Sequence, residues 1–188
     1  IAAELAKSGF TGPHRILEGR AGFLRSYSDT PRVEGMLDGL GSDYQILRVA
    51  IKPHAACRYS QGAIDAMLGL VLEHDVHPDA IERVRVGMFK AAFTSVVEPL
   101  ERKRRPRTMM DAQFSVFFAV TASALWRRVT VAEYRPERMT SPEVHALIDR
   151  VEPVHVPELD ALYPKRWPTT IEIALRDGRR LQARADAL

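Results

Sequence analysis

Two strand-like runs separated by an Asp-Gly pair constrain the fold of this chain more than any other feature. Residues 169–175 and 179–185 are each interpreted as a strand, and Asp177-Gly178 lies between them. An Asp-Gly pair tolerates the positive φ angles of a tight turn, so the two runs are predicted to form an antiparallel hairpin. The fold must therefore contain an antiparallel sheet, and helices are needed to cover it.

Hydrophobic periodicity predicts further elements along the chain. Predicted strands comprise residues 44–51, 81–88 and 154–156, and predicted helices comprise residues 61–74, 111–126 and 142–151. Short helices are expected at 2–7, 21–28 and 32–40, and a short helical turn at 14–18. Ser60 and Ser141 are placed to cap the helices that follow them. Residues 90–107 show no clear period. From residue 44 onward the pattern predicts an α+β fold, with helices packed on a mostly antiparallel sheet.

The composition is that of an ordinary globular protein. Hydrophobic residues make up 46% of the 188 positions and charged residues 27%, and the formal net charge is +3. No apolar run approaches the roughly 20 residues that a membrane-spanning helix needs. The single cysteine, Cys57, excludes an internal disulfide and a finger-type zinc site. We therefore expect a cytoplasmic protein without a membrane partner.

Two patterns are interpreted as solvated surface. The basic run from Arg102 to Arg107 could attract an anion or a nucleic acid. No aromatic residues are interleaved with it, so a solvated loop is predicted and no nucleic-acid partner. His74 and His77 lie at the end of a predicted helix without an evident third ligand, so no metal site is predicted there.

The segment that begins at Lys52 is the least generic part of the sequence. A strand-like run delivers Lys52 to a turn marked by Pro53, and small and polar residues then lead into the helix that starts at Gln61. This pattern fixes a cation at the junction of two elements, where residues that bind or react are commonly found. By its spacing alone, however, a lysine in this position is more often simply solvated.

Several segments, in this order and at these spacings, resemble the MmgE/PrpD family, which contains 2-methylcitrate dehydratase, cis-aconitate decarboxylase and an iminodisuccinate epimerase. The matching segments are residues 3–13, 17–19, 22–23, 39–41 and 52–66, and the motif Asp111-Ala112-Gln113-Phe114-Ser115-Val116. The resemblance covers nearly the whole chain. The motifs at Lys52 and Asp111 make it specific.

The resemblance implies a division into domains. Members of the family have a large all-helical domain and a smaller α+β lid domain. Residues 1–42 are then expected to be trailing helices of the helical domain, and residues 43–188 to be most of the lid. The long N-terminal helical part of the family would be missing, so the chain is expected to be a fragment.

The resemblance also implies an activity. Members act on di- and tricarboxylic acids without a metal or organic cofactor, generally as homodimers. The leading hypothesis is a fragment of a lyase that eliminates water β to a carboxylate, as 2-methylcitrate dehydratase does in propionate metabolism. Alone it is expected to be inactive, because the family's acid/base residues lie in the missing part. The expected partners are a small carboxylic acid and either a second copy or the missing helical part.

In the family the motif lysine faces the cleft between the two domains, so Lys52 is the candidate catalytic residue. A fixed cation can hold a substrate carboxylate and stabilise the enolate-like charge that develops next to it. The candidate substrate-binding residues are His54, Cys57, Arg58 and Gln61. For Cys57 a small buried thiol is an alternative interpretation, and for Arg58 a surface ion pair is another.

Departures from the family pattern leave the reaction open. The family commonly has tyrosine where this chain has His54, histidine where it has Gln61, and tyrosine where it has Phe118. A hydroxyl donor and a titratable ring are therefore lost. The alternatives are an epimerase, decarboxylase or isomerase of the same family, or a non-catalytic interaction module that binds no small acid.

Overall fold

The computed structural model describes residues 1–187, and the chain divides into two units, Ile1–Val49 and Ala50–Leu188. The first unit contains α1 (Ala2–Lys7), α2 (Phe23–Tyr27) and the 3-10 helix η1 (Gln45–Arg48), joined by turns. Most of its large apolar side chains are exposed, and none of its residues belongs to the buried core. Its short helices are therefore not stabilised by a hydrophobic core of their own.

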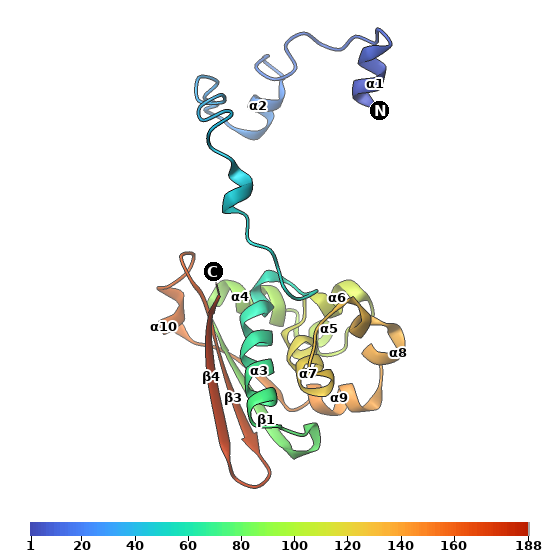
Figure 1. Ribbon diagram of the computed structural model, residues 1–188, viewed down its shortest axis with the longest axis vertical. Coiled ribbons are helices and arrows are strands. Elements are labelled where there is room, and N and C mark those ends of the chain that lie inside the picture. The colour runs from blue at the N-terminus through green and yellow to red at the C-terminus, as the bar shows by residue number, and fades with distance from the viewer. Residues whose placement is uncertain (188) are drawn as a thin grey trace. The chain divides into compact units, whose positions relative to one another are not determined.

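The second unit consists of a sheet and the helices that cover it (Figure 1). In chain order its elements are η2 (Arg58–Ser60), α3 (Gln61–Glu73), η3 (Pro78–Ala80), β1 (Ile81–Met88), α4 (Lys90–Val97), α5 (Leu100–Arg104), α6 (Met109–Gln113), α7 (Val116–Trp126), η4 (Val131–Tyr134), α8 (Pro136–Met139), α9 (Pro142–Ile148), β2 (Val151–His155), α10 (Pro157–Asp160), β3 (Trp167–Leu175) and β4 (Arg180–Ala187). The predicted α+β class is confirmed.

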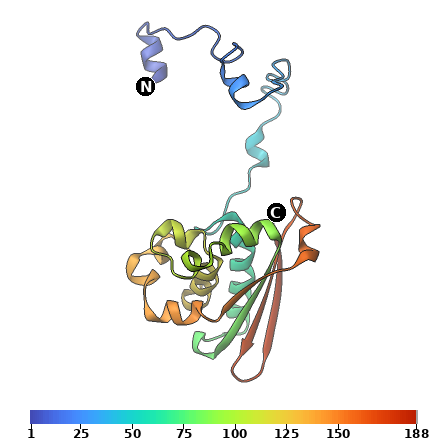
Figure 2. The ribbon, with the colours of Figure 1, turned by 180° about the vertical axis from the view of Figure 1, so that it is seen from behind.

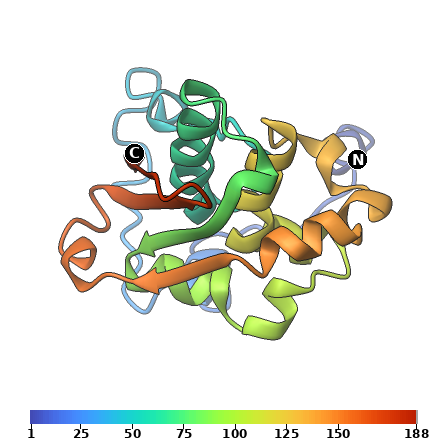
Figure 3. The ribbon, with the colours of Figure 1, turned by 90° about the horizontal axis from the view of Figure 1, so that it is seen from below.

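The sheet has the strand order β2-β1-β3-β4. The hairpin of β3 and β4 is antiparallel, as predicted, and Gly178 in its turn has a φ of 88°, which glycine adopts without strain. β1 pairs antiparallel with β3 and parallel with β2, so it lies inside the sheet, as the view in Figure 3 shows. The predicted mostly antiparallel sheet is thereby confirmed.

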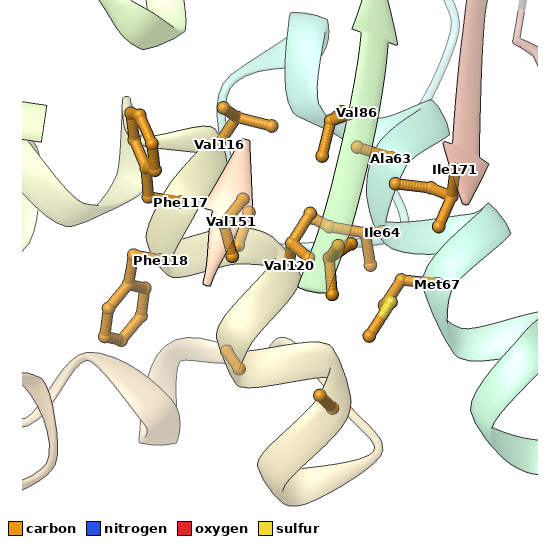
Figure 4. Packing of buried hydrophobic residues seen from close by; sticks show 14 of the residues in the cluster. Ala63, Ile64, Met67, Val86, Val116, Phe117, Phe118, Val120, Val151 and Ile171 are labelled. Atoms are coloured by element: carbon orange, nitrogen blue, oxygen red, sulfur yellow. The ribbon is translucent and has the colours of Figure 1, made fainter. Parts of the chain in front are cut away.

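The core forms where α3 and α7 pack together and α3 lies along β3 and β4. Alternate residues of the strands, such as Val86 and Ile171, are buried and meet Ile64 and Met67 of α3 (Figure 4). α7 is buried over most of its length, because α9 covers another side of it. Figure 2 shows α8 and α9 on the side of the unit away from the edge strand β4.

Two predictions for residues 32–51 are wrong. The apolar run 44–51 forms η1 and irregular backbone instead of a strand, because no neighbouring strand pairs with it and its apolar side chains are exposed. Residues 32–40 form successive turns instead of a helix, and glycines interrupt them. Without pairing or burial, β-prone composition does not specify a strand.

The helix predicted for residues 111–126 is two helices, α6 and α7, with a break at Phe114 and Ser115. The Ser115 side chain accepts a hydrogen bond from the Phe118 amide at 3.2 Å and so caps a new helix. Residues 90–107, which show no clear period, form α4 and α5. The break matters for the site, because it turns the end of α6 toward the Lys52 segment.

Candidate functional site

The segment from Lys52 to Cys57 is held in place by backbone hydrogen bonds to two distant parts of the chain. The Cys57 amide donates to the carbonyl of Gln113, at the end of α6, at 2.8 Å. The Ala55 amide donates to the carbonyl of Val129, in the loop after α7, at 3.2 Å. The segment is thus fixed between the α6–α7 break and the start of η4.

These three segments border an open pocket of about 440 Å³. It is lined by Lys52, Pro53, His54, Ala55, Ala56, Cys57, Gln113, Phe114, Val129, Thr130 and Val131. No carboxylate is among the lining residues, while Lys52 contributes a cation and His54 an imidazole. A small anion can therefore enter without meeting a like charge in the wall.

Three of the predicted site residues meet at this pocket. Lys52 is exposed, and among the described residues its amine makes no hydrogen bond or ion pair. His54 is half-buried, and its Nε2 lies 2.8 Å from Oδ1 of Asp65 in α3, which fixes the orientation of the ring. Cys57 is 8% exposed and forms part of the wall.

Arg58 does not line this pocket. Its guanidinium carbon lies 5.1 Å from the centre of the Trp167 ring, in a cation–π contact. Trp167 also stacks on Tyr59 at 4.9 Å, within an aromatic cluster of Tyr59, Phe89, Tyr163 and Trp167. The described contacts of Arg58 are thus with the aromatic cluster, and a role in substrate binding stays a prediction.

Gln61 is buried and does not line the pocket either. Its Nε2 donates to the carbonyls of His54 at 3.1 Å and Ala56 at 3.0 Å, and its Oε1 accepts from the His54 amide at 3.1 Å. The whole side-chain amide is therefore used to hold the loop that carries His54. Contact of Gln61 with a substrate stays a prediction.

Phe118, where the family pattern has tyrosine, is fully buried next to Trp126 and Tyr134. Neither Phe118 nor Gln61 lines the pocket, so neither of these two departures from the pattern alters its wall.

Asp111 stabilises the local fold. It forms a capping box with Thr108 at the start of α6, and Arg102 Nε donates to its Oδ1 at 2.5 Å. Burial opposes ionisation of Asp111, but the hydrogen bonds from Thr108 and Arg102 outweigh it and lower the pKa of the carboxyl. The carboxylate is fully engaged and supports the helix that carries Gln113.

Sequence reasoning missed the wall formed by Val129, Thr130 and Val131. These residues follow Lys52 by more than seventy positions, and only the fold brings them next to it. Their one local signal is the capping box of Thr130 and Glu133, which starts η4 but says nothing about a pocket.

Within residues 1–187 no cluster of three or more His, Cys, Asp or Glu side chains is arranged to hold a metal ion. None of the helices in that range has the length and apolar character of a membrane span.

A family model described as the MmgE/PrpD C-terminal domain matches residues 54–187. The chain belongs to this family. No curated protein matches the chain. The MmgE/PrpD family includes dehydratase-type enzymes, and the matched range contains most of the pocket wall but starts just after Lys52.

Proposed function

We propose that this chain is the lid portion of a cofactor-independent lyase that eliminates water β to a carboxylate of a di- or tricarboxylic acid, as 2-methylcitrate dehydratase does. The observation that carries the proposal is the position of Lys52 on a pocket of about 440 Å³ without a carboxylate in its wall. Membership of the MmgE/PrpD family supports a role of this kind.

The chemistry requires a fixed cation. A substrate of this class brings two or three negative charges, and charge develops next to a carboxylate when the neighbouring proton leaves. Lys52 is the candidate for holding that carboxylate, because its amine is exposed on the pocket and is not engaged elsewhere in the described chain. His54, held by Asp65, offers a ring nitrogen on the same wall.

The proposal includes the domain assignment. Residues 1–42 are assigned to the edge of an all-helical domain and residues 43–188 to the lid. The exposed apolar side chains of the first unit, such as Phe10, Leu37 and Leu40, favour this assignment, because short helices without a core need a larger body to pack on. That body is either the remaining helical part of the enzyme or a second copy.

Turnover tests the division of labour. The purified 188-residue chain is incubated with 2-methylcitrate and, separately, with cis-aconitate, and products are followed by chromatography. The proposal predicts no turnover by this chain alone, because the acid/base residues are assigned to the missing helical part. Product formation by the chain would contradict that assignment. Screening the intact enzyme against the same acids then separates a dehydratase from an epimerase, decarboxylase or isomerase.

A further inference from the structure

Lys103 is a buried lysine behind the wall of the pocket. It belongs to the basic run Arg102–Arg107, yet its side chain is only 9% exposed. Its Nζ donates to the carbonyl of Phe114 at 2.7 Å and lies 5.7 Å from the centre of the Phe114 ring. Ser115 Oγ in turn donates to the Lys103 carbonyl at 2.6 Å. Lys103 therefore lies against the α6–α7 break, in contrast to the solvated loop predicted for the run.

The Lys103 ammonium has no carboxylate partner among the described residues, and it contacts a residue that lines the pocket. That residue is Phe114, and Cys57 lines the same pocket. Asp111, whose charge raises the pKa of the Lys103 amine, is already bonded to Arg102. Phe114 supplies the one hydrogen bond of the ammonium among the described residues, so little of its charge is neutralised locally.

The Lys103 side chain is itself largely shielded from water, since it is only 9% exposed. The Phe114 ring that it contacts is 41% exposed and Cys57 is 8% exposed, so water screens this cation less than it screens a fully solvated one. An anion in the pocket would therefore be attracted by Lys52 from the solvent side and by Lys103 through the wall.

We propose that Lys103 is the second cation of the carboxylate pocket, a positioning residue that attracts a substrate carboxylate through the Phe114 wall without touching it. This inference rests on the proposed function and identifies a residue that contributes to the substrate specificity of the same site. It gives the pocket a preference for anions over neutral molecules of equal size.

Burial is the largest influence on the Lys103 amine and lowers its pKa, although Cys57 and Asp111 oppose the effect. A charge that burial disfavours does not make the fold more stable, and an unbranched apolar side chain of similar length can replace it. Lys103→Met is therefore expected to fold, which makes the charge testable by itself.

Cys57 is the single cysteine of the chain and lies in the pocket wall, so it serves as a built-in probe. Its sulfur displaces iodide from iodoacetate, a small carboxylate, and from iodoacetamide, a neutral molecule of nearly the same size. The rate of alkylation by iodoacetate divided by the rate of alkylation by iodoacetamide reports the electrostatic potential at Cys57. Because access to the thiol affects both reagents alike, the ratio is insensitive to loosening of the structure.

The ratio is measured for the 188-residue chain, Lys103→Met, Lys103→Arg and Lys165→Met. Lys165 is an exposed control that does not line the pocket. In Lys103→Met the ratio is expected to fall on the order of threefold to tenfold; in Lys103→Arg, which keeps the charge, most of the ratio should be retained; and Lys165→Met should leave it unchanged. An unchanged ratio in folded Lys103→Met would overturn the proposal.

If Lys103→Met does not fold, Lys52→Met replaces it, because this variant removes the lysine that lines the pocket and keeps Lys103 next to Phe114. A ratio in Lys52→Met above that of N-acetylcysteine supports the proposal, and a ratio equal to or below it overturns the proposal. Alkylation requires no turnover. A pocket that shows the predicted potential but binds no di- or tricarboxylic acid would therefore contradict the lyase proposal and leave the role of Lys103 as a cation intact.

Discussion

The side-chain amide of Gln61 and the backbone of His54 exchange two hydrogen bonds, each 3.1 Å long. The bonds join the first turn of α3 to the loop that precedes it, and the same amide also binds the Ala56 carbonyl. His54 is held a second time, through its ring, by Asp65 one turn further along α3. The pocket wall is therefore positioned by a helix, and a helix places it more rigidly than a free loop would.

Replacing Gln61 by alanine should destabilise the second unit by about 2–4 kcal/mol, because the His54 amide and the Ala56 carbonyl lose their partner and a buried void is left. Urea unfolding measures the change. Gln182→Ala is the control: Gln182 is exposed and bonds only Glu172, so its loss should cost less than about 0.5 kcal/mol. Equal effects of the two substitutions would mean that Gln61 does not support the loop.

Gly87 in β1 cannot accept a side chain. A Cβ there would lie 2.2 Å from Thr170 Oγ1 and 3.0 Å from Val156 Cγ2. Gly87→Ala should therefore destabilise the protein by about 1–3 kcal/mol, and adding Thr170→Ala should restore much of the loss. Thermal unfolding of the two single variants and the double variant measures this coupling. Additive losses would show that Thr170 is not the obstacle.

Gly69 offers the matched comparison. It lies in the helix α3, and nothing lies within 4 Å of a Cβ built there. Gly69→Ala should stabilise the protein by about 0.5–1 kcal/mol, because alanine loses less conformational freedom in a helix. The same thermal experiment applies, and a destabilised Gly69→Ala would contradict the geometry of α3.

Glu133 is fully buried and accepts hydrogen bonds from Thr130, Arg128 and Arg138. Burial raises its pKa, but these bonds outweigh burial, so the pKa lies below the ordinary 4.5. Glu133→Gln should lower the free energy of unfolding by about 2–4 kcal/mol near neutral pH, because the guanidinium groups of Arg128 and Arg138 lose their negatively charged partner. Glu137→Gln, at an exposed residue without such bonds, should have little effect.

The pH dependence follows from the direction of the Glu133 shift. A carboxyl whose folded pKa is depressed contributes stability above its unfolded value, about 4.5, and loses it as the pH falls through the lower folded value. The unmodified chain should thus lose stability below about pH 4.5 more steeply than Glu133→Gln does. Parallel pH profiles of the two proteins would contradict this assignment.

The sequence was sufficient where local rules and burial agree. The Asp177-Gly178 turn, the alternation in Ile81–Met88 and the Ser141-Pro142 helix start each predicted the element that the structure contains. It was insufficient for residues 44–51, because a strand needs a neighbour and composition does not supply one. It also missed the break before α7, which depends on the Ser115 cap and on Lys103 at the Phe114 carbonyl.

For the candidate site, the sequence motif that begins at Lys52 predicted where the pocket lies but not which of its residues line it. The fold gathers Lys52, His54 and Cys57 on one pocket, while Gln61 and Arg58 point to the loop and the aromatic cluster. These differences arise from contacts between distant segments, for example Cys57 with Gln113, which spacing along the chain does not encode. Lys103 was missed for the same reason, since its neighbours in the basic run are mostly solvated.

The central claim is that the amine of Lys52 holds a carboxylate in this pocket, and backbone amide chemical shifts during titration with citrate test it most directly. At constant ionic strength, the account predicts saturable shifts at His54–Cys57 and Thr130–Val131 that weaken about tenfold or more in Lys52→Met and persist in the exposed control Lys165→Met. Shifts of equal affinity in Lys52→Met, or none at the pocket in the unmodified chain, would contradict it.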